Sequence, residues 1–180
     1  DRVYVGGSEY IGFITKDQFG EYHFTNITPI DTKFDSIWDL IKCNNKIYFN
    51  SIYKLFEFNP ASGDVITMVF DSKLGALLCH NNQVTLQDRT NGFLELIDNQ
   101  WQPSEIQVPQ NPFVIDLTLI DENTYFVLSN QDKWQLLKNN EIVLLNFEKT
   151  LPNLNSYVSI AALTDGKLVL GSNNGLLTFV

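Results

Sequence analysis

The stretch Asp165–Phe179, DGKLVLGSNNGLLTF, reads as an apolar strand, a turn of small residues and a second apolar strand. The stretch Asp1–Ile14, DRVYVGGSEYIGFI, has the same form. Such self-similarity indicates a repeat architecture, and five copies of the unit recur with a period of about forty residues. The first apolar residues of the five copies are Val3, Ile47, Val84, Phe126 and Leu168.

Further apolar stretches flank each copy, so that a complete repeat contains four short strands, termed a, b, c and d. These strands are rich in Val, Ile, Leu, Phe and Tyr, and Asn, Asp and Gly bound them, as is typical of antiparallel β structure. Turns such as Cys43–Lys46, CNNK, suit tight hairpins because Asn tolerates positive φ. Four-stranded repeats of this length predict an all-β fold, with a β-propeller favoured over a β-sandwich.

The first repeat lacks strand a and the last lacks strand d, so we expect one domain that forms an arc of a larger propeller. The expected blades span residues 1–30, 34–72, 73–107, 112–148 and 156–180, of which the first and the last are partial. Such an arc would leave open blade edges. We expect further blades of a longer parent chain, or self-association, to cover these edges.

Charge and hydropathy exclude several partners. The net charge is −9, with 12 basic residues scattered among 21 acidic ones, which is unsuited to binding nucleic acid. No apolar run approaches the roughly 20 residues that cross a bilayer, so we expect no direct membrane contact and see no targeting segment. The histidines, His23 and His80, fall in different repeats without metal-ligand spacing, and no phosphate-binding loop is present. We therefore expect neither a metal nor a cofactor.

The two cysteines, Cys43 and Cys79, fall at nearly the same point of neighbouring repeats. Equivalent points on adjacent blades are expected to lie beyond the roughly 7 Å between Cα atoms that a disulfide allows. The sequence therefore predicts two free thiols.

The first and last repeats resemble those of a known family. The last repeat resembles that of two-component regulator propellers, and the matching residues are Asp165, Gly166, Leu168, Leu170, Gly171, Ser172, Asn174, Gly175 and Leu176. The opening VYVGGSEYIGFI, followed by FDSIWDL at residues 34–40, is similar to the variant found in triple-tyrosine sensor proteins of Bacteroidetes-type bacteria. The third and fourth repeats match only in pattern.

The resemblance implies a seven-bladed periplasmic propeller, followed by a triple-tyrosine domain, a membrane helix and a kinase or DNA-binding output. Many such sensors respond to polysaccharide fragments. We therefore expect a non-catalytic, ligand-sensing segment of a bacterial two-component receptor or related transcriptional regulator. The periplasm is the expected location, and the cytoplasm is the alternative.

Propellers build ligand sites from the b–c and d–a loops, which gather on one face. Here these loops are rich in amides and hydroxyls, which suit hydrogen bonding to a small molecule or an oligosaccharide, although Asn and Ser are also ordinary turn residues. Trp38 and Trp134 can either stack on a ligand or pack between blades. The candidate ligand-binding residues are Glu9, Trp38, Arg89, Asn91, Asn130, Trp134, Asn173 and Asn174.

Two other function classes stay open. A protein-interaction propeller of WD-repeat type would carry Trp-Asp pairs at the end of strand c, whereas Trp38-Asp39 lies at the start of strand a. A propeller lyase or hydrolase would place a histidine or a carboxylate pair at the inner ends of the a strands. Asp39 and Asp116 lie on strand a, but no histidine matches them.

Overall fold

The computed structural model describes residues 2–108, 112–121, 124–129, 134–144, 157–162, 168–172 and 177–179, which form five antiparallel sheets and no helix. The first sheet contains β1 (Arg2–Gly6), β2 (Ile11–Lys16) and β3 (Tyr22–Asn26). The second contains β4 (Asp39–Cys43), β5 (Lys46–Asn50), β6 (Lys54–Phe58) and β7 (Val65–Val69). The third contains β8 (Leu74–His80), β9 (Gln83–Asp88), β10 (Gly92–Ile97) and β11 (Gln100–Pro103).

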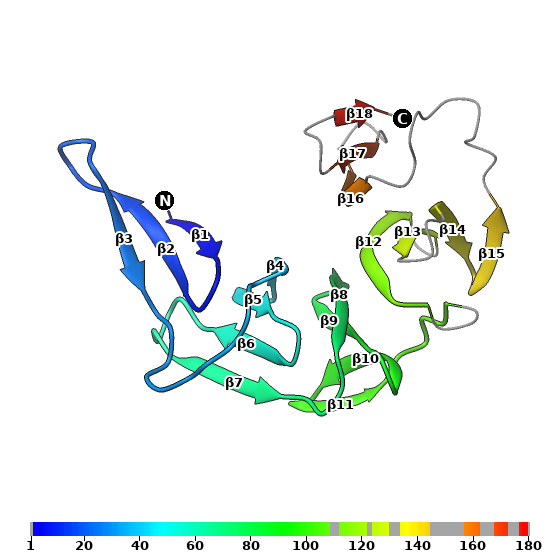
Figure 1. Ribbon diagram of the computed structural model, residues 1–180, viewed down its shortest axis with the longest axis horizontal. Coiled ribbons are helices and arrows are strands. Elements are labelled where there is room, and N and C mark those ends of the chain that lie inside the picture. Colours follow the sequence, from blue (N-terminus) through cyan, green and yellow to red (C-terminus); the bar gives the residue numbers. More distant parts are fainter. Residues whose placement is uncertain are drawn as a thin grey trace.

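The remaining two sheets continue the pattern. The fourth contains β12 (Val114–Asp121), β13 (Thr124–Ser129), β14 (Trp134–Lys138) and β15 (Glu141–Leu144), and the fifth contains β16 (Tyr157–Ala162), β17 (Leu168–Ser172) and β18 (Leu177–Phe179). The sheets follow one another around an arc, with β4, β8, β12 and β16 on its inner side and β7, β11 and β15 on its outer side (Figure 1). The predicted all-β propeller architecture is confirmed.

Tight hairpins join many of the strands because their turn residues adopt the left-handed conformation. The pairs Asn44-Asn45 and Asn81-Asn82 connect strands a and b of the second and third sheets, with φ between 46° and 60°. Asp98-Asn99 and Asn139-Asn140 connect strands c and d of the third and fourth sheets, with φ between 49° and 62°. Two-residue turns with positive φ at both positions match the right-handed twist of the strands that they join.

Consecutive sheets pack face to face, and side-chain alternation decides which residue faces which neighbour. In β5, Ile47 and Phe49 are buried against the first sheet, whereas Tyr48 is buried against the third. Val84 and Leu86 of β9 repeat this arrangement against the second sheet. The second sheet is therefore covered on both faces, and so is the third, whose Ala76 and Phe93 pack against the fourth sheet.

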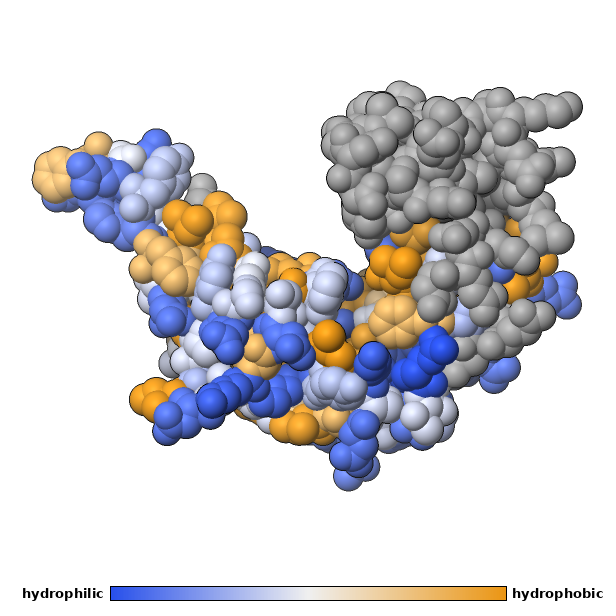
Figure 2. Space-filling view, in the orientation of Figure 1, coloured by the Kyte–Doolittle hydropathy of each residue, from blue (hydrophilic) through white to orange (hydrophobic). Residues whose placement is uncertain are grey.

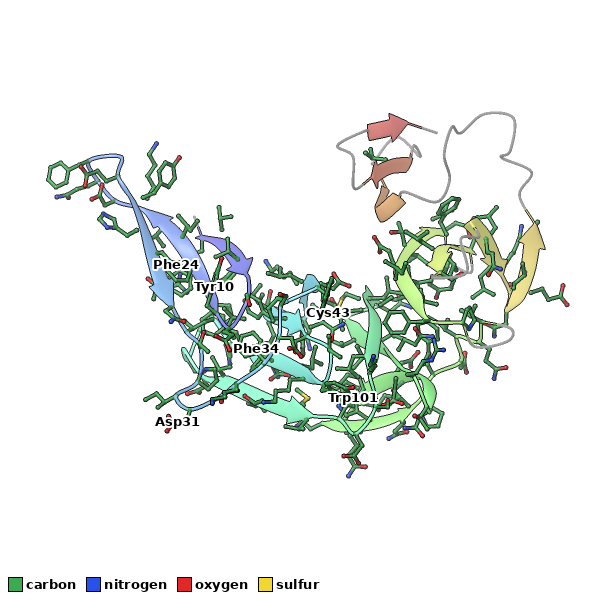
Figure 3. All side chains as sticks on the ribbon, viewed as in Figure 1. Tyr10, Phe24, Asp31, Phe34, Cys43 and Trp101 are labelled. Atoms are coloured by element: carbon green, nitrogen blue, oxygen red, sulfur yellow. A yellow bond between two sulfur atoms is a disulfide. The ribbon has the colours of Figure 1, made fainter. Side chains whose placement is uncertain are left out.

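The first sheet departs from this pattern among the described residues. By repeat register, Val3 corresponds to Ile47, but Val3 is 60% exposed whereas Ile47 is buried. All residues of β3 are exposed, and the β2–β3 hairpin projects from the arc (Figure 1). On the same face, the rings of Tyr10 and Phe24 lie edge to face at 5.7 Å between centroids (Figure 3). One face of this sheet thus has no neighbouring sheet among the residues that the structure describes.

The prediction of two free thiols is wrong, because Cys43 and Cys79 form a disulfide with 5.5 Å between their Cα atoms. Cys43 directly precedes its Asn-Asn turn, whereas His80 stands between Cys79 and the next such turn. The offset of one residue reverses the side-chain direction, so the two cysteines point at each other from facing sheets. Both lie on inner strands, β4 and β8, where the blades approach most closely (Figure 3).

Side-chain amides near the C-terminal ends of the b strands bridge neighbouring sheets. Asn50 Nδ2 donates to Gly75 O at 2.6 Å. Gln87 occupies the same place in the next repeat, and its Nε2 donates to Pro112 O while its Oε1 accepts from Val114 N, both at 2.7 Å. A Cβ atom at Gly75 would lie only 2.3 Å from Gln87 Oε1, so this close approach requires glycine.

No helix long and apolar enough to span a membrane occurs among the described residues.

Candidate functional site

A cavity of about 760 Å³ lies at the end of the sheets where the a strands begin and the b strands end. Because a and b strands are antiparallel, the segments before each a strand and after each b strand gather at this end. The second, third and fourth sheets all contribute. The lining residues are Trp38, Asp39, Asn50, Ile52, Lys73, Leu74, Gly75, Arg89, Phe113, Val114, Ile115 and Asp116.

Trp38 gives this cavity an open aromatic surface. Its backbone N–H donates to Asn50 O at 2.8 Å, which fixes the main chain just before β4. The side chain is nevertheless 70% exposed, so the indole is not buried between blades. Hydrophobic and hydrophilic residues are interspersed on the face of the molecule that Figure 2 shows. An indole in such a place can stack on an apolar ligand face.

Polar groups converge on the same cavity from three sheets. Lys73 precedes β8 and Arg89 follows β9, and the Arg89 guanidinium lies 5.7 Å from the centroid of the Phe113 ring. Asp39 and Asp116 stand at the corresponding ends of β4 and β12. The cavity therefore offers cationic, anionic and aromatic groups together, as ligand-binding cavities commonly do.

Asp39 bridges two blades through its carboxylate. Its Oδ1 accepts the N–H of Leu40 at 2.8 Å, and its Oδ2 accepts the N–H of Leu77 on β8 at 3.1 Å. Burial raises the pKa of this carboxyl, and the two backbone N–H groups offset that rise in part. Desolvation therefore outweighs the hydrogen bonds here.

The raised pKa has a consequence for stability against pH. The folded protein binds the Asp39 proton more tightly than the unfolded chain does, so this group stabilises the fold at low pH and that contribution is lost as pH rises through the folded pKa. The unfolding free energy of the wild type minus that of Asp39→Asn is therefore expected to fall as pH rises above 3.8, the ordinary pKa of an aspartate. Urea titrations from pH 3.5 to 7 measure this difference, and a difference that rises with pH would contradict the prediction.

Asn50 contributes an unusual group to the cavity wall. Its residue is only 2% exposed, and its Oδ1 finds no hydrogen-bond partner among the described residues. The longer Gln87 satisfies both ends of its amide on the next blade. Buried amide oxygens are normally paired, so the Asn50 amide marks a point where this inter-blade bridge is incomplete.

The structure brings together two of the predicted site residues, Trp38 and Arg89. Asn91 lies instead in a smaller cavity with Trp101, and its amide Nδ2 donates to Asp88 Oδ1 at 3.1 Å, as a turn residue does. Glu9 is exposed with φ of 64° and does not line the large cavity.

The other predicted site residues are not placed in the cavity by the described part of the chain. Asn130, Asn173 and Asn174 lie outside the described residues. Trp134 begins β14, and its side chain lies outside the described part as well. Sequence reasoning did not single out Lys73 or Phe113, although each falls just before an a strand, and that position was the available signal.

The histidines lie away from the large cavity. His23 Nε2 is 2.9 Å from Asp17 Oδ2 in the projecting β2–β3 hairpin, where Glu21 also stands close enough to form a three-residue group that could hold a cation. Asp17 Oδ1 accepts the N–H groups of Phe19 and Glu21, so its carboxylate already shapes the hairpin turn. His80 Nδ1 lies 3.3 Å from Tyr125 Oη between the third and fourth sheets.

Several solved structures are similar to this chain over nearly all of its length. A protein assigned as a gluconolactonase gives a TM-score of 0.69 at 12% identity, over 99% of this chain and 70% of that one. Virginiamycin B lyase from Staphylococcus aureus gives 0.62 at 14% identity, over 96% of this chain and 63% of the lyase. The extracellular domain of a protein assigned as a hybrid two component system from B. thetaiotaomicron gives 0.67 at 10% identity, over 99% of this chain and 29% of that domain.

No protein-family model matches the chain, and no curated protein matches it. Among the solved structures, this chain spans less than two thirds of the length of the lyase and under a third of the length of the sensor's extracellular domain. At these identities the likeness concerns the fold alone. The chain thus has a β-propeller fold that sensor domains and enzymes share.

Proposed function

We propose that the chain is a non-catalytic, ligand-sensing propeller segment of a bacterial two-component receptor, and that its ligand, a carbohydrate fragment, binds in the large cavity. The observation that carries the proposal is the exposed indole of Trp38 beside hydrogen-bonding groups from three sheets. Sugar rings present apolar faces to aromatic side chains and hydroxyls to polar ones.

The sensor assignment has two supports. The first and last repeats resemble those of two-component regulator propellers and triple-tyrosine sensors, and the chain is similar in fold to 29% of the extracellular domain of a protein assigned as a hybrid two component system. In such a receptor, further blades would cover the exposed face of the first sheet that includes Val3 and Phe24.

The disulfide supports an extracytoplasmic location of the chain. A bond between Cys43 and Cys79 is typical of proteins in oxidising, extracytoplasmic environments. Together with the sensor resemblance, the disulfide supports a periplasmic location for the proposed ligand site.

Replacement of Trp38 tests the proposal. An array of defined oligosaccharides identifies binders of the wild type, and calorimetry then compares affinities. Trp38→Ala is expected to weaken binding about tenfold, because stacking on an aromatic ring contributes about 0.5–1.5 kcal/mol beyond area burial. Trp101→Phe is the matched control, since Trp101 packs on Phe70 at the outer side of the arc and should leave affinity unchanged (Figure 3). Equal affinities of wild type and Trp38→Ala would refute the site.

A second candidate, a lyase or hydrolase, is favoured by one observation: the carboxylates of Asp39 and Asp116 line the same cavity. Paired carboxylates can act as general acid and general base. Chromatography of the bound oligosaccharides after prolonged incubation distinguishes the two functions. Cleavage that is lost in both Asp39→Asn and Asp116→Asn would favour the enzyme, and recovery of intact ligand favours the sensor.

A further inference from the structure

One residue in the wall of the large cavity carries a polar atom that has no hydrogen-bond partner in the described part of the chain. Asn50 lines the cavity and is only 2% exposed, and its Oδ1 is the unpaired atom. Its Nδ2 donates to Gly75 O at 2.6 Å, which fixes the end of the amide that carries the oxygen. A buried acceptor without a partner destabilises a protein. A donor from a bound molecule would remove this penalty.

The bridge between the second and third sheets cannot use this oxygen as the next bridge does. Gln87 holds the same position in the third sheet, and its Oε1 accepts the N–H of Val114 at the start of β12. The corresponding residue at the start of β8 is Leu74, whose N–H already donates to Ile52 O at 2.8 Å. The Asn50 oxygen is therefore left over when this bridge is complete.

The strand that faces Asn50 is irregular at this point. The pairing of β8 with β9 shifts register between Leu74 and Leu77, at a β-bulge that includes Gly75. Such bulges are over-represented next to functional sites. Asp39 is the cross-strand partner of Asn50, but both of its carboxylate oxygens accept backbone N–H groups, so it supplies no donor to the amide.

Asn50 also adjoins the aromatic surface of the cavity. Its backbone O accepts the N–H of Trp38 at 2.8 Å, so the two residues are joined through their main chains. The exposed indole and the unpaired oxygen therefore come from adjoining points of one sheet. A sugar ring carries hydroxyls around its edge, and each hydroxyl is a hydrogen-bond donor. A ring stacked on the indole can thus present a donor to this wall.

We propose that Asn50 Oδ1 accepts a hydrogen bond from one hydroxyl of the sugar ring that stacks on Trp38. The inference rests on the proposed function, since it assigns one contact of that ligand. A site built to bind a hydroxyl rejects analogues that lack it, because a buried polar group is then left unpaired. Asn50 is therefore a specificity-determining residue, which selects the ring position and configuration of one hydroxyl.

Methyl β-glucoside, methyl β-galactoside and methyl α-mannoside are the probes, each with its monodeoxyfluoro analogues, and NMR titration measures their affinities. Fluorine is close in size to a hydroxyl but cannot donate a hydrogen bond. One analogue of a glycoside that binds is expected to bind the wild type about two- to tenfold more weakly than its parent. In Asn50→Leu this difference should disappear. Each comparison is made within one variant, so a change in the stability of the fold cancels.

Ser129→Ala is the matched control. Ser129 holds the position of Asn50 in the fourth sheet, is 1% exposed and has an Oγ without a partner among the described residues, but it does not line the cavity. Its parent–analogue differences should equal those of the wild type. A measurement on the wild type alone covers the case in which Asn50→Leu fails to fold. The NMR shift of the Asn50 side-chain carbonyl carbon should differ between the complexes with the parent and with the weakened analogue, because a hydrogen bond deshields that carbon.

A difference that disappears in Asn50→Leu and persists in Ser129→Ala supports the inference. Analogues that all bind the wild type as well as their parents, differences that persist in Asn50→Leu, or equal carbonyl shifts in the two complexes overturn it. In these cases Trp38-dependent binding of the glycosides leaves the proposed function standing. Failure of all three glycosides to bind also overturns the inference, whereas the oligosaccharide array alone decides the proposed function.

Discussion

Replacement of both Cys43 and Cys79 by alanine is expected to lower the free energy of unfolding by about 3 to 4 kcal/mol. The bond closes a loop with a sequence separation of 36 residues. In the chain-entropy account, a cross-link of this span restricts the unfolded chain by roughly that amount. Urea unfolding of the oxidised wild type and of the double variant measures the difference.

The single variant Cys43→Ala controls for packing. It breaks the same bond and leaves one free thiol, so its stability should lie close to that of the double variant. Thiol titration of the unfolded, unreduced wild type should find no free group. Two titratable thiols, or equal stabilities of the wild type and the double variant, would show that the bond does not form in solution.

Gln87→Leu is expected to destabilise the protein by about 2 to 6 kcal/mol. The residue is fully buried, and its amide pairs with Pro112 O and Val114 N of the next blade. Leucine fills a similar volume but leaves both backbone groups buried without partners, at about 1–3 kcal/mol for each. The midpoint of urea unfolding reports the loss.

Gln83→Leu is the matched control, because it makes the same substitution at the exposed first residue of the same strand, β9. Its stability should stay within about 0.5 kcal/mol of the wild type. A loss for Gln87→Leu as small as that for Gln83→Leu would mean that the inter-blade amide bridge contributes nothing measurable.

The sequence predicted the architecture well because its signals are local and repeated. Asn44-Asn45 and the later turn pairs specify hairpins of one type, and the apolar strands between them alternate in one register. Each repeat therefore adds evidence for the same four-stranded unit. Local patterns of this kind survive even where individual residues of a repeat have diverged.

The two cysteines can pair because their positions in the repeat differ by one residue. The sequence placed Cys43 and Cys79 near the same point of adjacent repeats, but His80 offsets the second cysteine by one position. In a strand this offset reverses the side-chain direction, and the inner strands are also the closest ones. Counting from the Asn-Asn turns would have revealed the offset, whereas the approach of β4 and β8 needed the structure.

The candidate site was predicted only in part, since the d–a segments have no periodic pattern to fix them. Trp38 and Arg89 adjoin predicted strands, and both line the cavity at one end of the sheets. Lys73 and Phe113 meet Arg89 only through the arrangement of three blades, which no local signal encodes. Asn91 and Glu9 carry suitable chemistry, but their backbone turns place them elsewhere.

The one-sided packing of the first sheet has a consequence for how the chain opens. In repeat proteins, stability approximates a sum of intrinsic and nearest-neighbour terms, so a unit with one neighbour has one interface term fewer. Val3 is exposed where the corresponding Ile47 of the next blade is buried, and all residues of β3 are exposed whereas the corresponding strand, β7, is partly buried. The first sheet is therefore expected to be less protected than the second and third sheets, and its amide hydrogens should exchange through a local opening that leaves those two sheets, joined by the disulfide, intact.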